Sequence, residues 1–309
     1  MPNSNSTEFY LDAPLILSEV QALRDLQEII GESLPEIDSF RYSSFGFKHQ
    51  NNHVVGLGLH GKHLDSLPPS LGNFSKLIAL VMEHNQITAF PSSIENLHSL
   101  QYLDVTYNVL THIPQSFCRL PRLETFKCSN NNLEDLPDLF GNLTTLKLLD
   151  LSDNHLATLP ASFPLLNKLY TLKLSRNPLP SLPEEFEGLS SLRELHIEGL
   201  GITNLPKNIG NLAKLEKLYA GNNNLTFLPK SIEYLTALQI LFLENNNILT
   251  LPKNFGTLRS LSELNLSHNS LSQLPSSMEN LHRLKMVFLL GNKIGTVPDY
   301  LQSIPNLHV

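Results

Sequence analysis

Cysteine is scarce in this chain, which has 309 residues and carries only Cys118 and Cys128. Disulfides persist in oxidising compartments, and small secreted folds depend on several of them. Two cysteines in the body of the chain, with none near either end, cannot supply such a framework. The sequence therefore predicts two free thiols in a reducing compartment, and hence a cytoplasmic protein.

Basic stripes and long apolar runs are also lacking. The chain has 22 Lys and Arg against 29 Asp and Glu, a formal net charge of −7, which does not suit nucleic-acid binding. No apolar run approaches the roughly 18 residues of a membrane span. The first residues, MPNSNSTEFYLDAPLIL, have no basic region before their apolar patch, unlike a signal peptide. We expect neither nucleic acid nor a membrane as partner.

Motifs of common enzyme families are missing as well. The chain has no G-x-x-x-x-G-K-S/T phosphate loop, no G-x-G-x-x-G at a strand–helix junction, no H-E-x-x-H and no C-x-x-C. A catalytic site would have to be assembled from distant segments. We therefore predict a protein that is not an enzyme, has no catalytic residues and uses no cofactor.

What the sequence does have is a proline every 23 residues, from Pro68 to Pro298. The same residue types recur around each proline. In the unit Leu146–Lys168 they are a strand-like L-x-x-L-x-L, an Asn, two further apolar positions, then Phe163 and Leu166. This period predicts eleven coils of 23 residues over residues 54–306, with residues 307–309 as the truncated start of a twelfth.

Each predicted coil must pack against its neighbours. The second and third leucines of L-x-x-L-x-L lie two residues apart, so both point to the same side of a strand. Proline ends the strand because it has no N–H, and the following apolar pair suits a short 3₁₀ turn. Burial within one coil contributes roughly 10–20 kcal/mol, less than its ordering cost of roughly 35 kcal/mol. The coils are therefore expected to stack into a solenoid.

An Asn follows nearly every predicted strand. Turned inward, its amide can satisfy backbone groups of its own coil and of the adjacent one. Lys62 in the first coil and Leu200 in the seventh depart from this pattern, and Leu200 is a candidate for a change of curvature. The predicted structural Asn ladder comprises Asn85, Asn108, Asn131, Asn154, Asn177, Asn223, Asn246, Asn269 and Asn292.

The segment before the coils has a different pattern. Residues 1–9 are polar and aperiodic, which predicts a disordered tail, and residues 10–53 are predicted to form an N-terminal cap. In this cap we expect an amphipathic helix that begins after Asp12 and ends at Gly31. A hairpin is expected at residues 50–52, since Asn tolerates positive φ. Its extra strand would cover the edge of the sheet.

The motif L-x-x-L-x-L-x-x-N-x-L-x-x-L-P resembles the leucine-rich repeat family over roughly four fifths of the chain. The resemblance implies an α/β fold. It is a right-handed solenoid shaped as a horseshoe or arc, with a concave parallel β-sheet, a convex side of short 3₁₀ or helical turns, and an N-terminal helix and hairpin cap. The segment FGFKHQNNHVVGLGLHGKHLDSLP resembles intracellular archaeal and bacterial members, which are binding modules. The L-P-x-x-I/F-x-x-L half-repeat resembles Ras-group scaffolds, which implies a small GTPase as one class of partner.

One cluster in the first coils has the residue types of a metal site. His60 and Glu83 occupy the same outward column in successive coils, about 5 Å apart on a parallel ladder, and His84 is adjacent. Imidazole and carboxylate groups are zinc ligands. The alternative is a solvated histidine-rich edge, and we predict no metal.

The register also predicts which residues point outward on the concave face. Acids and bases alternate in the first half, at Asp104, Lys127, Asp150 and Lys173. At one-strand spacing they should neutralise each other. From His196 onward the column turns aromatic and its surroundings acidic, which is typical of a partner-binding patch. The predicted partner-binding residues are Tyr219, Phe242, Phe288, Ile240, Met286, Glu194, Glu198, Glu244 and Glu263.

These observations predict a non-enzymatic module that binds a protein or peptide. One alternative is the recognition arm of a longer signalling protein, since the chain stops as a twelfth coil begins, and a distant one is an enzyme with a site assembled across coils. The aromatic residues could instead be incidental, or be covered by a C-terminal segment. The last coil would leave an apolar flank open. We therefore expect residues 299–309 to fold over it, or monomers to associate end to end.

Overall fold

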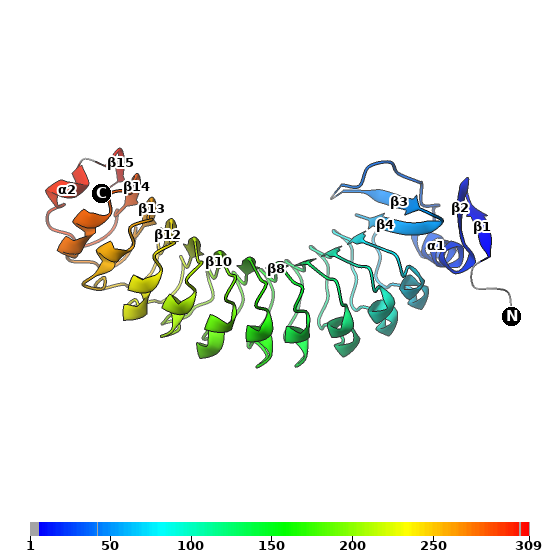
Figure 1. Ribbon diagram of the computed structural model, residues 1–309, viewed down its shortest axis with the longest axis horizontal. Coiled ribbons are helices and arrows are strands. Elements are labelled where there is room, and N and C mark those ends of the chain that lie inside the picture. The colour runs from blue at the N-terminus through cyan, green and yellow to red at the C-terminus, as the bar shows by residue number, and fades with distance from the viewer. Residues whose placement is uncertain (1–5, 42, 303, 309) are drawn as a thin grey trace. The chain divides into compact units, whose positions relative to one another are not determined.

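The computed structural model describes residues 6–41, 43–302 and 304–308. The chain divides into two compact units, which are residues 1–155 with 160–163, and residues 156–159 with 164–309. Within each unit, strands line one side of the coils and short 3₁₀ turns line the other (Figure 1). We call the sheet surface that points away from the coil interior the open face of that unit.

The first unit opens with a hairpin that the sequence did not predict. Strands β1 (Thr7–Tyr10) and β2 (Ala13–Ile16) pair antiparallel, and helix α1 spans Leu17–Ile30. The helix thus begins later than expected, because residues 13–16 bury Ala13 and Leu15 as a strand. The predicted disordered tail was wrong for residues 7–9. Residues 1–5 lie outside the described part of the chain.

Two predicted features of the cap are present. Helix α1 ends at Gly31, which has a left-handed φ of 82°. Strands β3 (Phe45–Gln50) and β4 (His53–Leu59) pair antiparallel around Asn51 and Asn52, whose φ values are 51° and 63°. Glu19 of α1 is fully buried, and its carboxylate accepts a 2.6 Å hydrogen bond from the Val54 amide. This contact ties the helix to the first strand of the coils.

The remaining strands of the first unit are parallel, and each follows the previous one after 23 residues. They are β5 (Ala79–Val81), β6 (Tyr102–Asp104), β7 (Thr125–Lys127) and β8 (Leu148–Asp150), in the spatial order β3-β4-β5-β6-β7-β8. Partners in adjacent strands are matched column by column, as in Ala79 with Tyr102 and Val81 with Asp104. The middle residue of each short strand is buried, so its two neighbours belong to the open face.

The second unit continues the pattern. Its strands are β9 (Thr171–Lys173), β10 (Glu194–His196), β11 (Lys217–Tyr219), β12 (Ile240–Phe242), β13 (Glu263–Asn265), β14 (Met286–Phe288) and β15 (Asn306–His308). Helix α2 spans Asp299–Gln302, and β15 pairs parallel with β14. The segment after residue 298 therefore extends the sheet and buries Leu301, which is 1% exposed. This is one of the two outcomes expected for the last coil.

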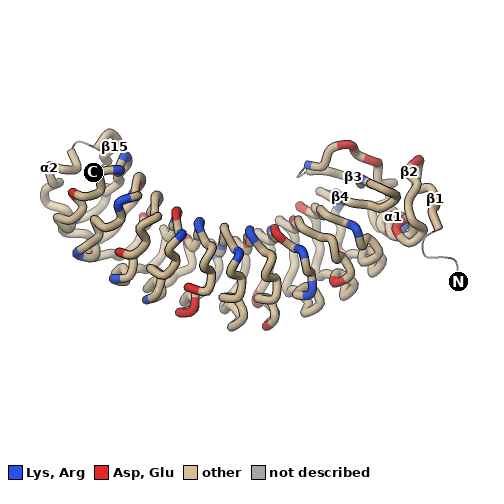
Figure 2. The backbone as a smooth tube through the Cα atoms, viewed as in Figure 1, with Lys and Arg blue, Asp and Glu red and all other residues tan. Residues whose placement is uncertain are grey.

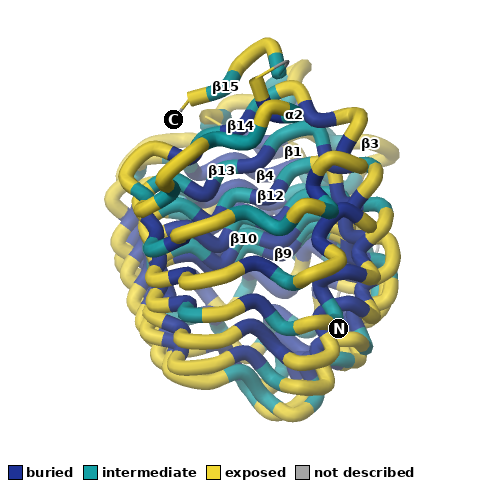
Figure 3. The backbone as a smooth tube through the Cα atoms, turned by 90° about the vertical axis from the view of Figure 1, so that its left-hand side faces the viewer, coloured by how far each residue is buried: buried dark blue, intermediate teal, exposed yellow. Residues whose placement is uncertain are grey.

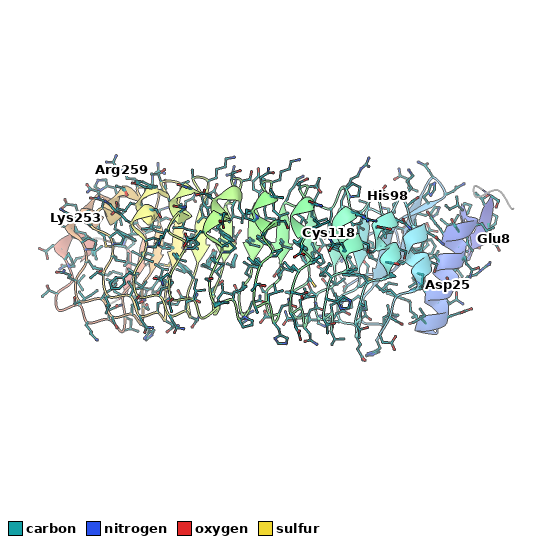
Figure 4. All side chains as sticks on the ribbon, turned by 90° about the horizontal axis from the view of Figure 1, so that it is seen from below. Glu8, Asp25, His98, Cys118, Lys253 and Arg259 are labelled. Atoms are coloured by element: carbon teal, nitrogen blue, oxygen red, sulfur yellow. The ribbon has the colours of Figure 1, made fainter. Side chains whose placement is uncertain are left out.

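The turns lie opposite the strands. They are η1 (Pro69–Asn73), η2 (Ser92–Asn96), η3 (Gln115–Arg119), η4 (Phe140–Asn142), η5 (Phe163–Leu165), η6 (Glu184–Gly188), η7 (Ile209–Asn211), η8 (Lys230–Tyr234), η9 (Phe255–Thr257) and η10 (Ser276–Asn280). Buried and exposed segments alternate around each coil, with the leucine positions buried (Figure 3). Cys118 belongs to η3 on the turn side (Figure 4). Cys118 and Cys128 are free and buried, and burial raises the pKa of Cys118 to about 11.

The Asn side chains bond to the backbone in one repeated geometry. The Asn131 amide nitrogen donates to the carbonyls of Val105 (3.0 Å) and Cys128 (3.2 Å), and its oxygen accepts from the Leu110 amide (3.0 Å). The same pattern holds at Asn85, Asn108, Asn223, Asn246, Asn269 and Asn292. Asn154 and Asn177 accept from the amides of Leu133 and Leu156.

Two coils depart from this geometry. Lys62 turns away from the ladder and places its ammonium 2.7 Å from Glu32 and 3.5 Å from the Phe45 ring centroid. Leu200 is 4% exposed, so a leucine fills the interior position that an Asn occupies elsewhere. The flanking Gly199 and Gly201 have φ values of 66° and 82°. These two coils keep the strand register while losing the amide bonds of the ladder.

Candidate binding surface

The predicted partner-binding residues all lie in the second unit, and parallel pairing places most of them in two columns of its open face. One column contains Glu194, Lys217, Ile240, Glu263 and Met286. The next contains His196, Tyr219, Phe242, Asn265 and Phe288. Glu198 and Glu244 follow two residues after their strands.

Three rings in consecutive strands form a continuous row, which we call the aromatic row. His196 stacks on Tyr219 with ring centroids 4.3 Å apart and an interplanar angle of 15°. Tyr219 meets Phe242 edge to face at 5.4 Å and 89°. Both arrangements are favourable for aromatic pairs. The row ends at Asn265, and Phe288 stacks separately on His308 at 4.6 Å.

The apolar residues of this face are half-buried rather than exposed. This holds for Tyr219, Phe242, Phe288, Ile240 and Met286, although no layer formed by the described residues covers the open face. Pointing outward therefore does not leave these side chains fully exposed. Parallel strands lie about 4.8 Å apart, so rings in one column cover each other. What remains accessible is the ring edges and outer faces.

Carboxylates surround the aromatic row, and we call Glu194, Glu198, Glu244 and Glu263 the carboxylate rim. His196 connects two of them, with its Nε2 2.9 Å from Glu194 Oε1 and its Nδ1 3.6 Å from Glu198 Oε1. Burial alone would lower the pKa of His196, but its hydrogen bonds to Glu198 and Glu194 outweigh burial and raise the pKa. Glu194 and Glu198 thus favour the protonated form of His196 relative to a free imidazole.

The pKa values of Glu198 and Glu244 shift in opposite directions, although both side chains are half-buried. Burial would raise the pKa of Glu198, but hydrogen bonds from His196 and Ser175 outweigh it and lower that pKa. Burial raises the pKa of Glu244, and the negative charge of Glu198 adds to the effect. Within the described residues, the buried Oε2 atom of Glu244 has no hydrogen-bond partner. A hydrogen bond from its own backbone N–H lowers the pKa of Glu244 in part, but one oxygen has no partner and no cation of the described residues pairs with this carboxylate.

On the open face of the first unit, the Asp104 carboxylate is satisfied by groups of the same unit. Asp104 has a fully buried side chain that lies 3.3 Å from Lys127 Nζ. It accepts hydrogen bonds from the Tyr102 hydroxyl at 3.0 Å and the Thr106 amide at 3.1 Å. A hydrogen bond also joins its carboxyl group to Glu83. Asp104 and Lys127 thus pair across strands, as expected of the alternating column.

The side chains of His60, Glu83 and His84 do not point to one common position at which a metal ion could bind. His60 Nδ1 lies 3.5 Å from Glu83 Oε2, and the His60 and His84 rings meet edge to face at 5.2 Å. His84 instead stacks on Tyr107 with centroids 4.4 Å apart. Over residues 6–41, 43–302 and 304–308, no three His, Cys, Asp or Glu side chains are grouped so that they could hold a metal ion.

Some contributors to this surface were not among the predicted site residues. His196, Ser175 and Lys217 contact the carboxylate rim, and Gly221 lies between Glu198 and Glu244 in the coil order. The 23-residue register could have found them, since Ser175, Glu198, Gly221 and Glu244 share one column. Acidic and basic residues are interspersed over both units, without a basic stripe (Figure 2). No helix among the described residues is long and apolar enough to cross a membrane.

Comparisons with known proteins agree with the repeat pattern. A family model described as a leucine-rich repeat region matches residues 182–286, and a leucine rich repeat model matches residues 90–133 and 104–156. A leucine-rich repeat protein of Leptospira interrogans is 30% identical with a TM-score of 0.65, over 80% of this chain and 74% of that one. The chain belongs to the leucine-rich repeat family. No curated protein sequence matches it.

Two further solved structures share the fold. One comes from an octameric complex of Latrophilin 3, Unc5D and FLRT2, in which FLRT2 supplies the leucine-rich repeats. It is 26% identical with a TM-score of 0.71, and the match covers 86% of each chain. The other comes from a TLR13–ssRNA13 complex. It is 28% identical with a TM-score of 0.62, over 82% of this chain and 43% of that one.

Proposed function

We propose that this protein is a non-enzymatic binding module of the cytoplasm, and that the open face of its second unit binds a protein or peptide partner. The observation that carries the proposal is the aromatic row within the carboxylate rim. Half-buried rings at the centre of a surface, with charges around them, concentrate binding energy in a few side chains. The solved relative in the FLRT2 complex supports protein binding as a function of this fold.

The charge of this surface favours protein over nucleic acid. A phosphate backbone would be repelled by Glu194, Glu198, Glu244 and Glu263, and the whole chain has a formal net charge of −7. The structure in the TLR13–ssRNA13 complex shares the fold, but a shared fold does not imply a shared ligand. The free, buried state of Cys118 and Cys128 supports a reducing compartment.

Paired variants on the two open faces test this proposal. A partner is captured from native lysate and its affinity for purified variants is measured by calorimetry. Tyr219→Ser with Phe242→Ser should weaken binding at least about tenfold, because it removes the central rings. The melting temperature should stay within a few degrees, since both rings lie outside the coil core.

The matched control is Asp104→Ser with Lys127→Ser in the first unit. This control changes two open-face residues whose contacts are internal, so it should alter affinity less than about twofold. The opposite result, with Asp104 and Lys127 essential and the aromatic row dispensable, would place the site in the first unit and refute the proposal.

A further inference from the structure

We infer that the segment bound by the second unit is basic, and that it places the cationic group of a lysine or arginine against Glu244 and Glu198 beside the Tyr219 ring. This inference rests on the proposed function and names the chemistry of the partner. It follows from the different states of the four rim carboxylates.

Two of the rim carboxylates already have partners. Glu194 contacts His196 at 2.9 Å and Lys217 Nζ at 3.8 Å. Glu198 contacts His196 at 3.6 Å and accepts a hydrogen bond from the Ser175 hydroxyl. The His196 ring and the Lys217 ammonium group therefore both contact this end of the rim.

The other two carboxylates lack a cation. Glu244 and Glu263 form no ion pair with any described residue, and the buried Oε2 of Glu244 has no hydrogen bond. A buried carboxylate without a partner costs free energy. Burial raises the pKa of Glu244, and the nearby charge of Glu198 raises it further. A cation from a partner would satisfy this group and relieve its repulsion from Glu198.

Gly221 makes the position of Glu244 possible. A Cβ atom on Gly221 would lie 2.5 Å from Glu244 Oε1, so a larger residue at this position would displace the carboxyl group from the place it occupies against Gly221. Glu198, Gly221 and Glu244 occupy the same position in three successive coils. The absent side chain of Gly221 thus leaves the carboxyl group of Glu244 on the side that faces Glu198.

The Tyr219 ring completes the arrangement. Its pKa is raised by burial and by the charges of Glu194, Glu263 and Glu198, so the ring lies within the field of the rim. An ammonium or guanidinium group is attracted to an aromatic face as well as to carboxylates. The aliphatic part of a lysine or arginine can also pack on apolar residues. Ile240 and Phe242 supply such a surface in the next strand.

A random dodecapeptide phage library tests the inference without a known partner. The library is selected separately on the parent protein, on Glu198→Gln/Glu244→Gln, and on Tyr219→Ser/Phe242→Ser. Peptides from the parent should be enriched in Lys or Arg at one position by about fivefold over the unselected library, and the double Gln variant should lose this enrichment. Glu185→Gln/Glu279→Gln, which changes two exposed carboxylates on turns η6 and η10 of the same unit, is the control of equal charge change and should leave the enrichment intact.

A selected peptide then gives a quantitative test. Replacing its enriched Lys or Arg by neutral norleucine should weaken binding to the parent about tenfold but binding to Glu198→Gln/Glu244→Gln less than about twofold, because the two changes remove the same contact. Both Gln substitutions preserve side-chain size, so the fold should be unaffected.

The selections distinguish a failure of the proposed function from a failure of this inference. Selected peptides that need Tyr219 and Phe242 but show no basic preference would overturn this inference and leave the proposed function standing. A selection that yields no peptide sensitive to Tyr219→Ser/Phe242→Ser would overturn the proposed function and this inference with it.

Discussion

The open faces of the two units have the same strand register but opposite uses of charge. In the first unit, Asp104 is fully buried and is bound by Lys127, Tyr102 and Thr106. In the second unit, Glu244 has a buried oxygen without a partner among the described residues. A carboxylate held by its own chain has little left to offer a ligand. The comparison teaches that the side chains, and not the repeat, decide where a partner binds.

The aromatic residues differ in the same way. Tyr102 of the first unit donates its hydroxyl hydrogen to Asp104 and has Lys127 Nζ 5.4 Å from its ring centroid. In the second unit, Tyr219 stacks on His196 and meets Phe242 edge to face, and its hydroxyl forms no hydrogen bond within the described residues. The first ring is used to bury a charge, and the second remains available for recognition.

The largest expected effect on stability comes from removing the contacts of Asp104 in the first unit. Asp104→Ser should lower the free energy of unfolding by about 2–3 kcal/mol, because it removes the buried carboxylate that pairs with Lys127 and accepts hydrogen bonds from the Tyr102 hydroxyl and the Thr106 amide. Urea denaturation followed by circular dichroism measures this loss. A change below about 0.5 kcal/mol would show that the pairing in the first unit is not structural.

The ladder that both units share should give the next effect. Asn154→Ala should cost about 1–3 kcal/mol, because it removes bonds to the buried backbone at Leu133, Cys128 and Leu151. Leu200→Asn should be neutral or stabilising, since it would offer an acceptor to the Leu179 amide. Thermal unfolding compares both variants with the parent. Equal melting temperatures for Asn154→Ala and the parent would contradict the role of the ladder.

The stability of the protein should depend on pH through Glu83 of the first unit. Burial and the hydrogen bond and charge of Asp104 raise the pKa of Glu83 to about 7. Because an acid with a raised pKa binds its proton more tightly when folded, its contribution is fully present below about pH 4.5 and is lost as the pH rises through about 7. Stability should therefore fall by about 1–2 kcal/mol between pH 5 and pH 8.

Glu83→Gln isolates this contribution. The variant should flatten that part of the pH profile, measured by urea denaturation at each pH. Other groups also contribute to the parent profile: His60, whose lowered pKa acts in the opposite direction, and His196, whose raised pKa acts in the same direction. His196 keeps its surroundings in the variant, whereas His60 loses the carboxylate that lies 3.5 Å from its Nδ1, so part of the change in slope belongs to His60. An unchanged slope in Glu83→Gln would refute the shared proton between Glu83 and Asp104.

The smallest effect is expected at Glu244. Glu244→Gln should leave stability unchanged or raise it by up to about 1 kcal/mol near pH 8, because the charge it removes is uncompensated and lies near Glu198. Differential scanning calorimetry is sensitive enough for this shift. A loss of more than about 1 kcal/mol would mean that Glu244 has a structural partner.

The repeat made most of the architecture predictable. Spacing of leucine and proline placed the strands and turns, and it also located the columns of the open face. Residues 7–16 escaped prediction because Pro14 after Asp12 is as typical of a first helical turn as of an edge strand. Residues 306–308 escaped because β15 follows β14 after 20 residues and not 23, from Met286 to its partner Asn306.

The chemistry of the site was less predictable for a physical reason. A sequence register gives the column of each side chain but not its rotamer or its partner. It could not show that four groups contact the Asp104 carboxylate. It could also not show that the Glu244 carboxylate lies against Gly221 and that its Oε2 atom has no hydrogen-bond partner among the described residues. Nor could it show that stacking of His196, Tyr219 and Phe242 half-buries rings that no layer covers.

Carboxyl footprinting tests the location of the site most directly. The protein is labelled with carbodiimide and glycine ethyl ester, alone and with a saturating selected peptide, and labelled residues are quantified by mass spectrometry. The account predicts that the peptide protects Glu194, Glu198, Glu244 and Glu263, and leaves labelling of the exposed turn residue Glu279 unchanged. Protection confined to carboxylates of the first unit, with the four rim residues labelled equally in both samples, would contradict it.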